Sequence, residues 1–211
     1  MIGETINAPY AEKFTVSNVF SSDMVVQRGE HIRVWGFADA SENGRKVSGE
    51  FMGMFAEALI ENGAWTLTFG ARLNACAEQG NSMRIYTDRT AFVFENVLVG
   101  DVFMVIGQSN VAYSMAAHRT AVPEAERGGV GYDVPSTPIR LHYNSLMQET
   151  GVTRGTEEVC AELRNRETWK RADAAAVQDF SALGYLFAAE YARATGVPVG
   201  VIEIDGNGQP I

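Results

Sequence analysis

The second half of the chain is organised around Val102-Phe103-Met104-Val105-Ile106, which is followed by Gly107-Gln108-Ser109-Asn110. Five apolar residues in a row predict a strand. Gly107 permits a sharp turn, and the helix formers at residues 111–121 predict a helix after it. We therefore predict a strand, a tight turn and a helix, with Ser109 at the turn.

Two more strands are predicted downstream, at residues 139–143 and 199–204, with a loop-like region up to Trp169. Strands that alternate with helices favour a parallel sheet with right-handed connections. Three strands make a small sheet, and we expect the strand at 199–204 to have an open edge.

A long helix is predicted before the last of these strands. Apolar residues recur there at spacings of three and four, the pattern of one buried helix face: Leu183, Leu186, Phe187 and Tyr191. Gly196 and Pro198 mark its end. The Gly-rich residues 128–131 do not fit a phosphate-binding loop, so we interpret them as a flexible connection.

The first hundred residues read as short strands separated by turn residues, at 31–35, 58–61, 65–69 and 83–87. Asn62-Gly63 tolerates positive φ at both positions and predicts a hairpin. We therefore predict an α/β protein with two domains. An N-terminal antiparallel β-sandwich covers residues 1–96, and an α/β domain covers residues 97–211.

The charge of the chain argues against nucleic acid and membrane partners. Lys and Arg number 17 against 26 Asp and Glu, which gives a formal charge of −9 in 211 residues. This opposes attraction to nucleic acid or anionic lipid, so a neutral substrate is the simpler expectation. Because no signal-like or membrane-spanning run is evident, we expect a cytoplasmic protein, or a secreted or periplasmic one whose signal peptide was removed.

No metal or cofactor is expected from the sequence. Cys76 and Cys160 lie in different predicted domains and lack metal-ligand spacing, which favours free thiols. The acidic pair Glu157-Glu158 has no accompanying metal constellation and is expected at the surface.

Ser109 is the candidate nucleophile. It is predicted where a parallel strand ends, which is the edge at which open α/β sheets bind ligands. Amide groups at a helix start would stabilise the oxyanion that forms when its hydroxyl attacks an ester. A helix N-cap is the structural alternative. The segment lacks the last glycine of the G-x-S-x-G elbow, which excludes an ordinary α/β-hydrolase signature.

The segment from Gly100 to Asn110 resembles the Gly-Asp-Val-Trp and Gly-Gln-Ser-Asn-Met signature of sialate O-acetylesterases and related SGNH carbohydrate esterases. Further similarities to this family occur in order along the chain, at Ser22-Asp23-Met24-Val25-Val26-Gln27-Arg28, Val34-Trp35-Gly36, Asn62-Gly63-Ala64-Trp65, Phe180-Ser181-Ala182-Leu183-Gly184-Tyr185-Leu186-Phe187, Gly196-Val197-Pro198-Val199-Gly200-Val201-Ile202 and Asn207-Gly208-Gln209-Pro210-Ile211. The resemblance implies that the α/β domain is an incomplete SGNH domain, flavodoxin-like and three-layered.

The resemblance also implies an activity, the hydrolysis of acetyl esters on sugars through an acyl-serine intermediate. Ser109 would attack, and its N–H and that of Gly208 would hold the oxyanion, in a site also lined by Gly107, Gln108 and Asn110. Two positions depart from the family pattern: Asn207 replaces a glycine and Val111 replaces a methionine.

The base that would activate Ser109 is missing from the sequence. This family uses a histidine in an Asp-x-x-His element, whereas the residues three before His31, His118 and His142 are Arg28, Met115 and Ile139. We expect His31 at the surface, His142 in a strand and His118 too far along the helix. The chain is therefore expected to be completed by a C-terminal segment or second chain, and to hydrolyse acetyl esters poorly alone.

A noncatalytic carbohydrate-binding or assembly module is the alternative function. Trp35 or Trp65 would then supply an aromatic surface, although core packing is favoured for each tryptophan alone. Asp205 follows the last strand and is interpreted as a solvated turn carboxylate rather than a residue of the site.

Overall fold

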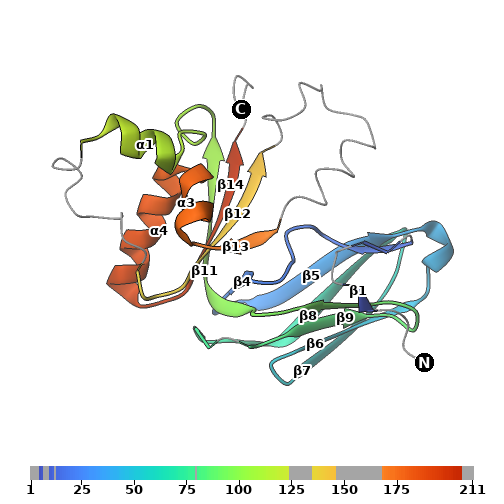
Figure 1. Cartoon of the computed structure of the whole chain (residues 1–211). Coiled ribbons are helices and arrows are strands. Elements are labelled where there is room, and N and C mark those ends of the chain that lie inside the picture. Colours follow the sequence, from blue (N-terminus) through green and yellow to red (C-terminus); the bar gives the residue numbers. More distant parts are fainter. Residues whose placement is uncertain are drawn as a thin grey trace.

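The computed structural model describes residues 5–6, 10–11, 13–78, 80–123, 135–145 and 168–205. It contains several β-sheets and a few helices, so the mixed architecture predicted from the sequence is confirmed. Figure 1 shows two parts, one built of strands and one in which helices flank a sheet, and the long strand β11 runs from one part into the other.

Two sheets build the first part. The first has the order β1-β10-β9-β6-β7, with bounds Thr5–Ile6, Ala91–Phe94, Met83–Tyr86, Lys46–Phe51 and Met54–Leu59. The second has the order β2-β3-β5-β8, with bounds Tyr10–Ala11, Phe14–Val16, His31–Ala38 and Ala64–Arg72. A short 3-10 helix at Ala40–Glu42 follows β5.

A single hydrophobic core lies between these two sheets. Side chains alternate between buried and exposed along β5 and β8, which is the period of a strand with one face in a core. Phe14 stacks on Trp65 at a ring distance of 5.2 Å and lies 5.7 Å from Phe92 of the opposite sheet. Trp65 is 3% exposed, which confirms the prediction that it packs in the core. Trp35 is 41% exposed, so the same interpretation was wrong for Trp35.

The Asn62-Gly63 turn forms with positive φ at both residues, 53° and 73°, as predicted. Glu61 and Ala64 exchange backbone hydrogen bonds of 2.9 and 3.1 Å across it. The strands on either side, β7 and β8, nevertheless belong to different sheets. The turn therefore carries the chain between the sheets and does not close a hairpin within one sheet.

The second part is built on a sheet of order β13-β12-β14-β11-β4, with bounds Trp169–Arg171, Ile139–Ser145, Val199–Asp205, Leu98–Gly107 and Val25–Gln27. Strands β12, β14, β11 and β4 run parallel, and β13 is antiparallel at one edge. The predicted open edge of the strand at 199–204 was wrong, because β14 lies between β11 and β12. The sequence cannot show this, since the last strand is inserted between two earlier ones.

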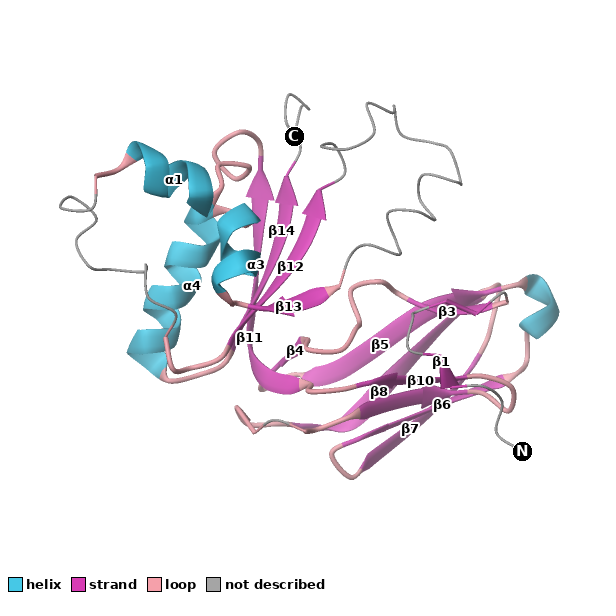
Figure 2. Ribbon diagram, viewed as in Figure 1, coloured by secondary structure: helices cyan, strands magenta, loops and turns pink. Residues whose placement is uncertain are grey.

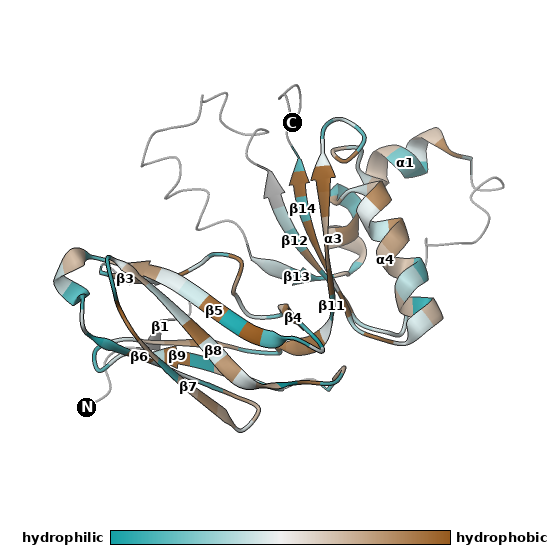
Figure 3. Cartoon of the chain, turned by 180° about the vertical axis from the view of Figure 1, so that it is seen from behind, coloured by the Kyte–Doolittle hydropathy of each residue, from teal (hydrophilic) through white to brown (hydrophobic). Residues whose placement is uncertain are grey.

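Three described helices cover one face of this sheet: α1 at Met115–Ala121, α3 at Ala174–Asp179 and α4 at Ala182–Thr195. Figure 2 shows them on the same side of β11, β14 and β12. They enclose a second core with Ile139, Leu141, Val199 and Val201 of the strands. Figure 3, from the opposite side, shows how hydrophobic β11 and β14 are.

Helix α4 presents a different face to the sheet than its apolar spacing predicted. Leu183 and Phe187 are 57% and 47% exposed, so a single buried face that includes them was wrong. The buried residues are mostly small: Ala182, Gly184, Tyr185, Ala188, Ala189 and Ala192. A Cβ on Gly184 would lie 3.1 Å from Val105, so the small residues let the helix approach the strand closely. Gly196 ends the helix in the left-handed conformation, as predicted.

A network of side chains joins the end of β4 and helix α4 to β11. Arg28 donates two hydrogen bonds of 2.9 Å to the Asp101 carboxylate, and Tyr191 donates a third, of 2.8 Å. Gln27 donates to the same carboxylate and accepts from the Val102 amide. Arg28 therefore holds the pKa of Asp101 below its ordinary value, although burial opposes this.

Candidate functional site

Ser109 lies in a tight turn directly after β11. The amides of Val111 and Ala112 both donate to the Gln108 carbonyl at 2.9 Å, which closes the turn. Ser109 and Asn110 are exposed at its tip, and Val111 is buried beneath it. A Cβ on Gly107 would lie 2.7 Å from the Val111 side chain, so this position needs a glycine for close approach.

The helix after the turn begins later than predicted. Helix α1 starts at Met115, and Ser114 is its N-cap, accepting from the Ala117 amide at 3.3 Å. Ser109 is therefore no N-cap, and the alternative that it merely caps a helix was wrong. The expected contribution of helix-start amides at Ser109 was also wrong. The physical reason is that residues 108–112 close on the Gln108 carbonyl before the helix can begin.

The carboxyl ends of three parallel strands meet at the edge where Ser109 lies. In the sheet register, Gly107 of β11 is paired with Asp205 of β14, which is paired with Ser145 of β12. Asp205 is 2% exposed, so its interpretation as a solvated turn carboxylate was wrong. It is the last residue of β14, and its Oδ1 has no hydrogen-bond partner among the described residues.

A second buried carboxyl group, Glu203, lies two residues before Asp205. It is 1% exposed, and its Oε2 accepts a 2.8 Å hydrogen bond from the Ser181 amide. Burial raises the pKa of Glu203 from 4.5 to about 8, the Ser181 hydrogen bond opposes this shift, and the charge of Asp205 adds to it. Sequence reasoning missed Glu203, because an isolated Glu in an apolar strand carries no motif.

None of the three histidines is held at Ser109 by a described contact. His31 is exposed and lies 3.2 Å from the Phe69 carbonyl, as expected for a surface residue of the first part. His142 is 1% exposed on β12, with its ring against Trp169, and burial lowers its pKa. His118 lies on α1, edge-on to Tyr113. The expected distance between His118 and Ser109 assumed one continuous helix, and this assumption was wrong, because α1 begins only at Met115.

Four of the predicted site residues, Gly107, Gln108, Ser109 and Asn110, share this one turn. The fifth, Gly208, lies outside the described residues, as do Asn207, Cys160 and the segments 128–131 and 157–158. Cys76 is a free, half-buried thiol. Within the described ranges, no group of three or more His, Cys, Asp or Glu side chains is placed to hold a metal ion.

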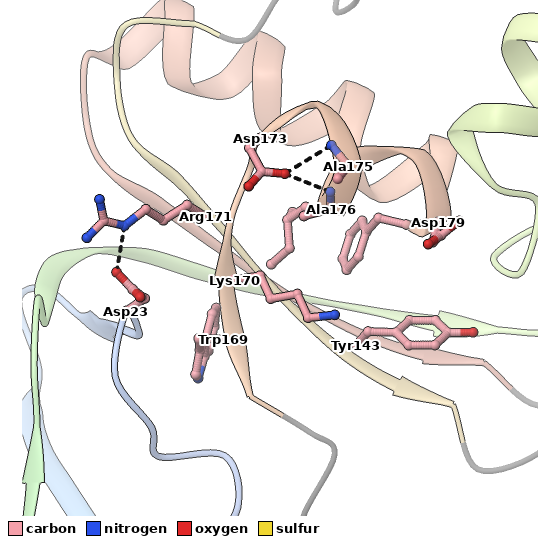
Figure 4. Close-up of a pocket in the computed structure, with 11 residues that line it drawn as sticks. Asp23, Tyr143, Trp169, Lys170, Arg171, Asp173, Ala175, Ala176 and Asp179 are labelled. Carbon is pink, nitrogen blue, oxygen red and sulfur yellow. Dashed lines mark hydrogen bonds and ion pairs between the residues drawn. The ribbon is translucent and has the colours of Figure 1, made fainter. Parts of the chain in front are cut away.

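A pocket of about 520 Å3 lies beside the edge strand β13 and helix α3 (Figure 4). Arg171 donates to Asp23 at 2.8 Å on one wall, and Asp173 caps α3 on another. Figure 4 shows Lys170 extending toward the ring of Tyr143, which comes from the carboxyl end of β12. The sequence predicted no strand here, because three residues are too few for a periodic signal.

Among the described residues, no helix is long and apolar enough to span a membrane.

Comparison with known proteins gives a likeness in structure only. No protein-family model and no curated protein sequence matches the chain. Among solved structures, a carbohydrate acetylesterase from Xanthomonas citri matches with a TM-score of 0.69 and 24% identity over 92% of this chain. The chain spans 40% of the length of that protein. An immunoglobulin-like domain of the ice-binding adhesin from M. primoryensis gives a TM-score of 0.30 over 44% of the chain, at 20% identity.

Proposed function

We propose that this chain is the nucleophile-bearing part of a carbohydrate O-acetylesterase of the sialate O-acetylesterase-like SGNH type. One observation carries the proposal. In a fold shared with a carbohydrate acetylesterase, Ser109 lies exposed in a turn at the carboxyl end of a parallel strand and caps no helix. An exposed serine that stabilises no helix, at the edge where α/β sheets bind ligands, is suited to attack.

In the proposed reaction, the Ser109 hydroxyl oxygen attacks the acetyl carbonyl carbon while a base takes its proton. The negative charge on the carbonyl oxygen would be held by the amides of Ser109 and Gly208, each worth about 3 kcal/mol by general precedent. The ester C–O bond then breaks, the sugar oxygen takes the proton, and an acetyl-serine remains. Water then attacks the carbonyl carbon of the acetyl-serine while the base takes its proton. The bond to the Ser109 oxygen breaks, this oxygen takes the proton back, and acetate leaves.

The base belongs to a completing C-terminal segment or a second chain in this proposal. A serine hydroxyl is a weak nucleophile without a base, and the three histidines have other surroundings. Residues 1–211 alone should therefore hydrolyse an acetyl ester weakly. A lone chain with robust, Ser109-dependent turnover would refute this part of the proposal.

The proposed ligand is an O-acetylated sugar or glycan, and neither nucleic acid nor a membrane surface. The net charge of −9 repels polyanions. We propose no metal or cofactor. The proposed location is the cytoplasm or, after removal of a signal peptide, the outside of the cell or the periplasm.

A serine-directed fluorophosphonate tests the role of Ser109. We expect slow labelling of the chain at Ser109, located by peptide mass spectrometry, and none in Ser109→Ala. Ser82→Ala is the matched control, because Ser82 is also exposed but lies outside the α/β sheet. Label on another serine, or equal labelling of Ser109→Ala, would overturn the proposal.

A noncatalytic carbohydrate-binding module remains the second candidate, because one observation favours it. Trp35 is 41% exposed and Phe37 60% exposed on the same face of β5, which forms an aromatic surface. Trp65 takes no part, since it is 3% exposed. Sugar binding that is lost in Trp35→Ala, survives Ser109→Ala and occurs without acetate release would favour this function.

A further inference from the structure

The buried side chain of Glu203 lies on the helix-covered face of the sheet, two residues before the carboxyl end of β14. In the register, Glu203 is paired with Val105 of β11 on one side and Tyr143 of β12 on the other. It is therefore part of the rigid centre of the parallel sheet. Its carboxyl group belongs to the same three-strand layer from which the Ser109 turn departs.

The hydrogen bond that Glu203 accepts satisfies a backbone group with no other described partner. Ser181 joins α3 to α4, is 1% exposed, and donates its amide to Glu203 at 2.8 Å. The Ser181 hydroxyl has a separate role: it caps α4 by accepting a hydrogen bond from the Gly184 amide. A buried amide without an acceptor is costly, so Glu203 fixes the junction of the two helices to the sheet.

The same junction is bonded to the exit of the Ser109 turn. The Ala182 amide donates to the Tyr113 carbonyl at 2.8 Å, and the Met115 amide donates to the Phe180 carbonyl at 2.9 Å. These two bonds flank an isolated β-bridge between Ser114 and Ser181. The chain that leaves Ser109 is thereby held between α3 and α4 within six residues.

Both ends of the turn are consequently anchored to the same sheet. Its entrance follows directly from Gly107, which is paired with Asp205. Its exit is tied through residues 113–115 to the helix junction, and through the junction to Glu203. The path closes a ring through β11, the turn, Ser181, Glu203 and β14.

We propose that Glu203 is a positioning residue for Ser109, which fixes the exit of the nucleophile turn by holding the Ser181 amide. The link to Ser109 chemistry rests on the proposed function. The link to the turn itself does not, because it consists of hydrogen bonds between described residues. Loss of the acceptor should loosen residues 109–115 without unfolding the sheet.

The test compares Glu203→Met with Glu203→Gln. Methionine fills a similar volume but accepts hydrogen bonds only weakly, whereas the glutamine carbonyl retains the acceptor. Glu190→Gln is the matched control, on the solvent side of α4. At pH 5, where ionisation of the unfolded-state Glu203 has lowered stability little, we expect amide hydrogen exchange at Met115 and Ala182 to be about tenfold faster in Glu203→Met and nearly unchanged in the other two variants. Exchange in β6 and β9 of the first part should stay the same in all.

A second readout follows the reactivity of Ser109. In Glu203→Met, we expect the limiting rate of fluorophosphonate labelling to fall about tenfold while the half-saturating concentration stays unchanged, with rescue in Glu203→Gln. Unchanged exchange at residues 109–115, a uniform rise across the protein, or failure of glutamine to restore both readouts would overturn the proposal. Absence of Ser109 labelling in the wild-type chain would instead refute the proposed function, while hydrogen exchange still decides the role of Glu203.

Discussion

Replacing Glu203 with Gln should remove a large pH dependence of stability. The folded protein raises the pKa of this carboxyl group from 4.5 to about 8, chiefly through burial. The folded state therefore binds a proton that the unfolded state releases at any pH between these two values. Stability must fall as pH rises through this window, and the loss is complete above the folded pKa.

The size of the loss follows from the two pKa values of 4.5 and about 8. At about 1.4 kcal/mol for each pH unit in the window, ionisation of Glu203 in the unfolded state lowers the free energy of unfolding by about 2 kcal/mol at pH 6 and about 3 kcal/mol at pH 7. The cost approaches about 5 kcal/mol at pH 9, where the folded group is ionised too. Glutamine cannot ionise, yet it keeps a carbonyl acceptor for the Ser181 amide.

Urea unfolding followed by circular dichroism at 222 nm would measure this, because all three described helices pack on the sheet that holds Glu203. Between pH 5 and pH 9, the wild-type chain should lose about 4 kcal/mol more than Glu203→Gln. Glu190→Gln should follow the wild type, since Glu190 is an exposed partner of Arg193. Parallel curves for the wild type and Glu203→Gln would refute the reasoning from burial.

Three further substitutions test other parts of the structure, each by urea unfolding. Asp101→Asn breaks the ion pair with Arg28 and should cost about 1–3 kcal/mol above the unfolded pKa of Asp. Since the folded pKa of Asp101 is lowered, that difference should shrink as pH falls through it, and a constant difference would contradict this. Gly107→Ala should cost about 1–3 kcal/mol because its Cβ would meet Val111 at 2.7 Å, and Val111→Ala in the same chain should relieve part of this cost. Gly196→Ala should cost about 1 kcal/mol, because φ is 68° there while nothing lies within 4 Å of the new Cβ, and an unchanged midpoint would exclude strain.

Features of the candidate site that depend on neighbouring residues could be predicted, and those that depend on packing could not. The apolar run before Gly107 and the polar residues after it predicted a strand and a turn, and both are present. The start of α1 was misplaced because residues 111–113 have apolar or helix-compatible side chains. What the pattern could not include was the closure of the turn on Gln108 and the bonds from residues 113–115 to the α3–α4 junction.

Several local features of this protein could be read directly from its sequence. Residue identity predicts the positive φ of Asn62, Gly63 and Gly196. Short patterns predict the strand before Ser109 and show that the sequence contains no Asp-x-x-His element. Such features depend on the sterics of one residue or on the period of one element, and both can be read along the chain.

Which faces and which charged groups are buried depends on contacts between elements that lie far apart in the sequence. The tertiary structure inserted β14 between β11 and β12, joined β4 to the second sheet, and turned the small residues of α4 toward the strands. It also enclosed the carboxyl groups of Glu203 and Asp205. The physical reason is that burial belongs to a pair of packed surfaces, and the partner of each surface lies far away in the sequence.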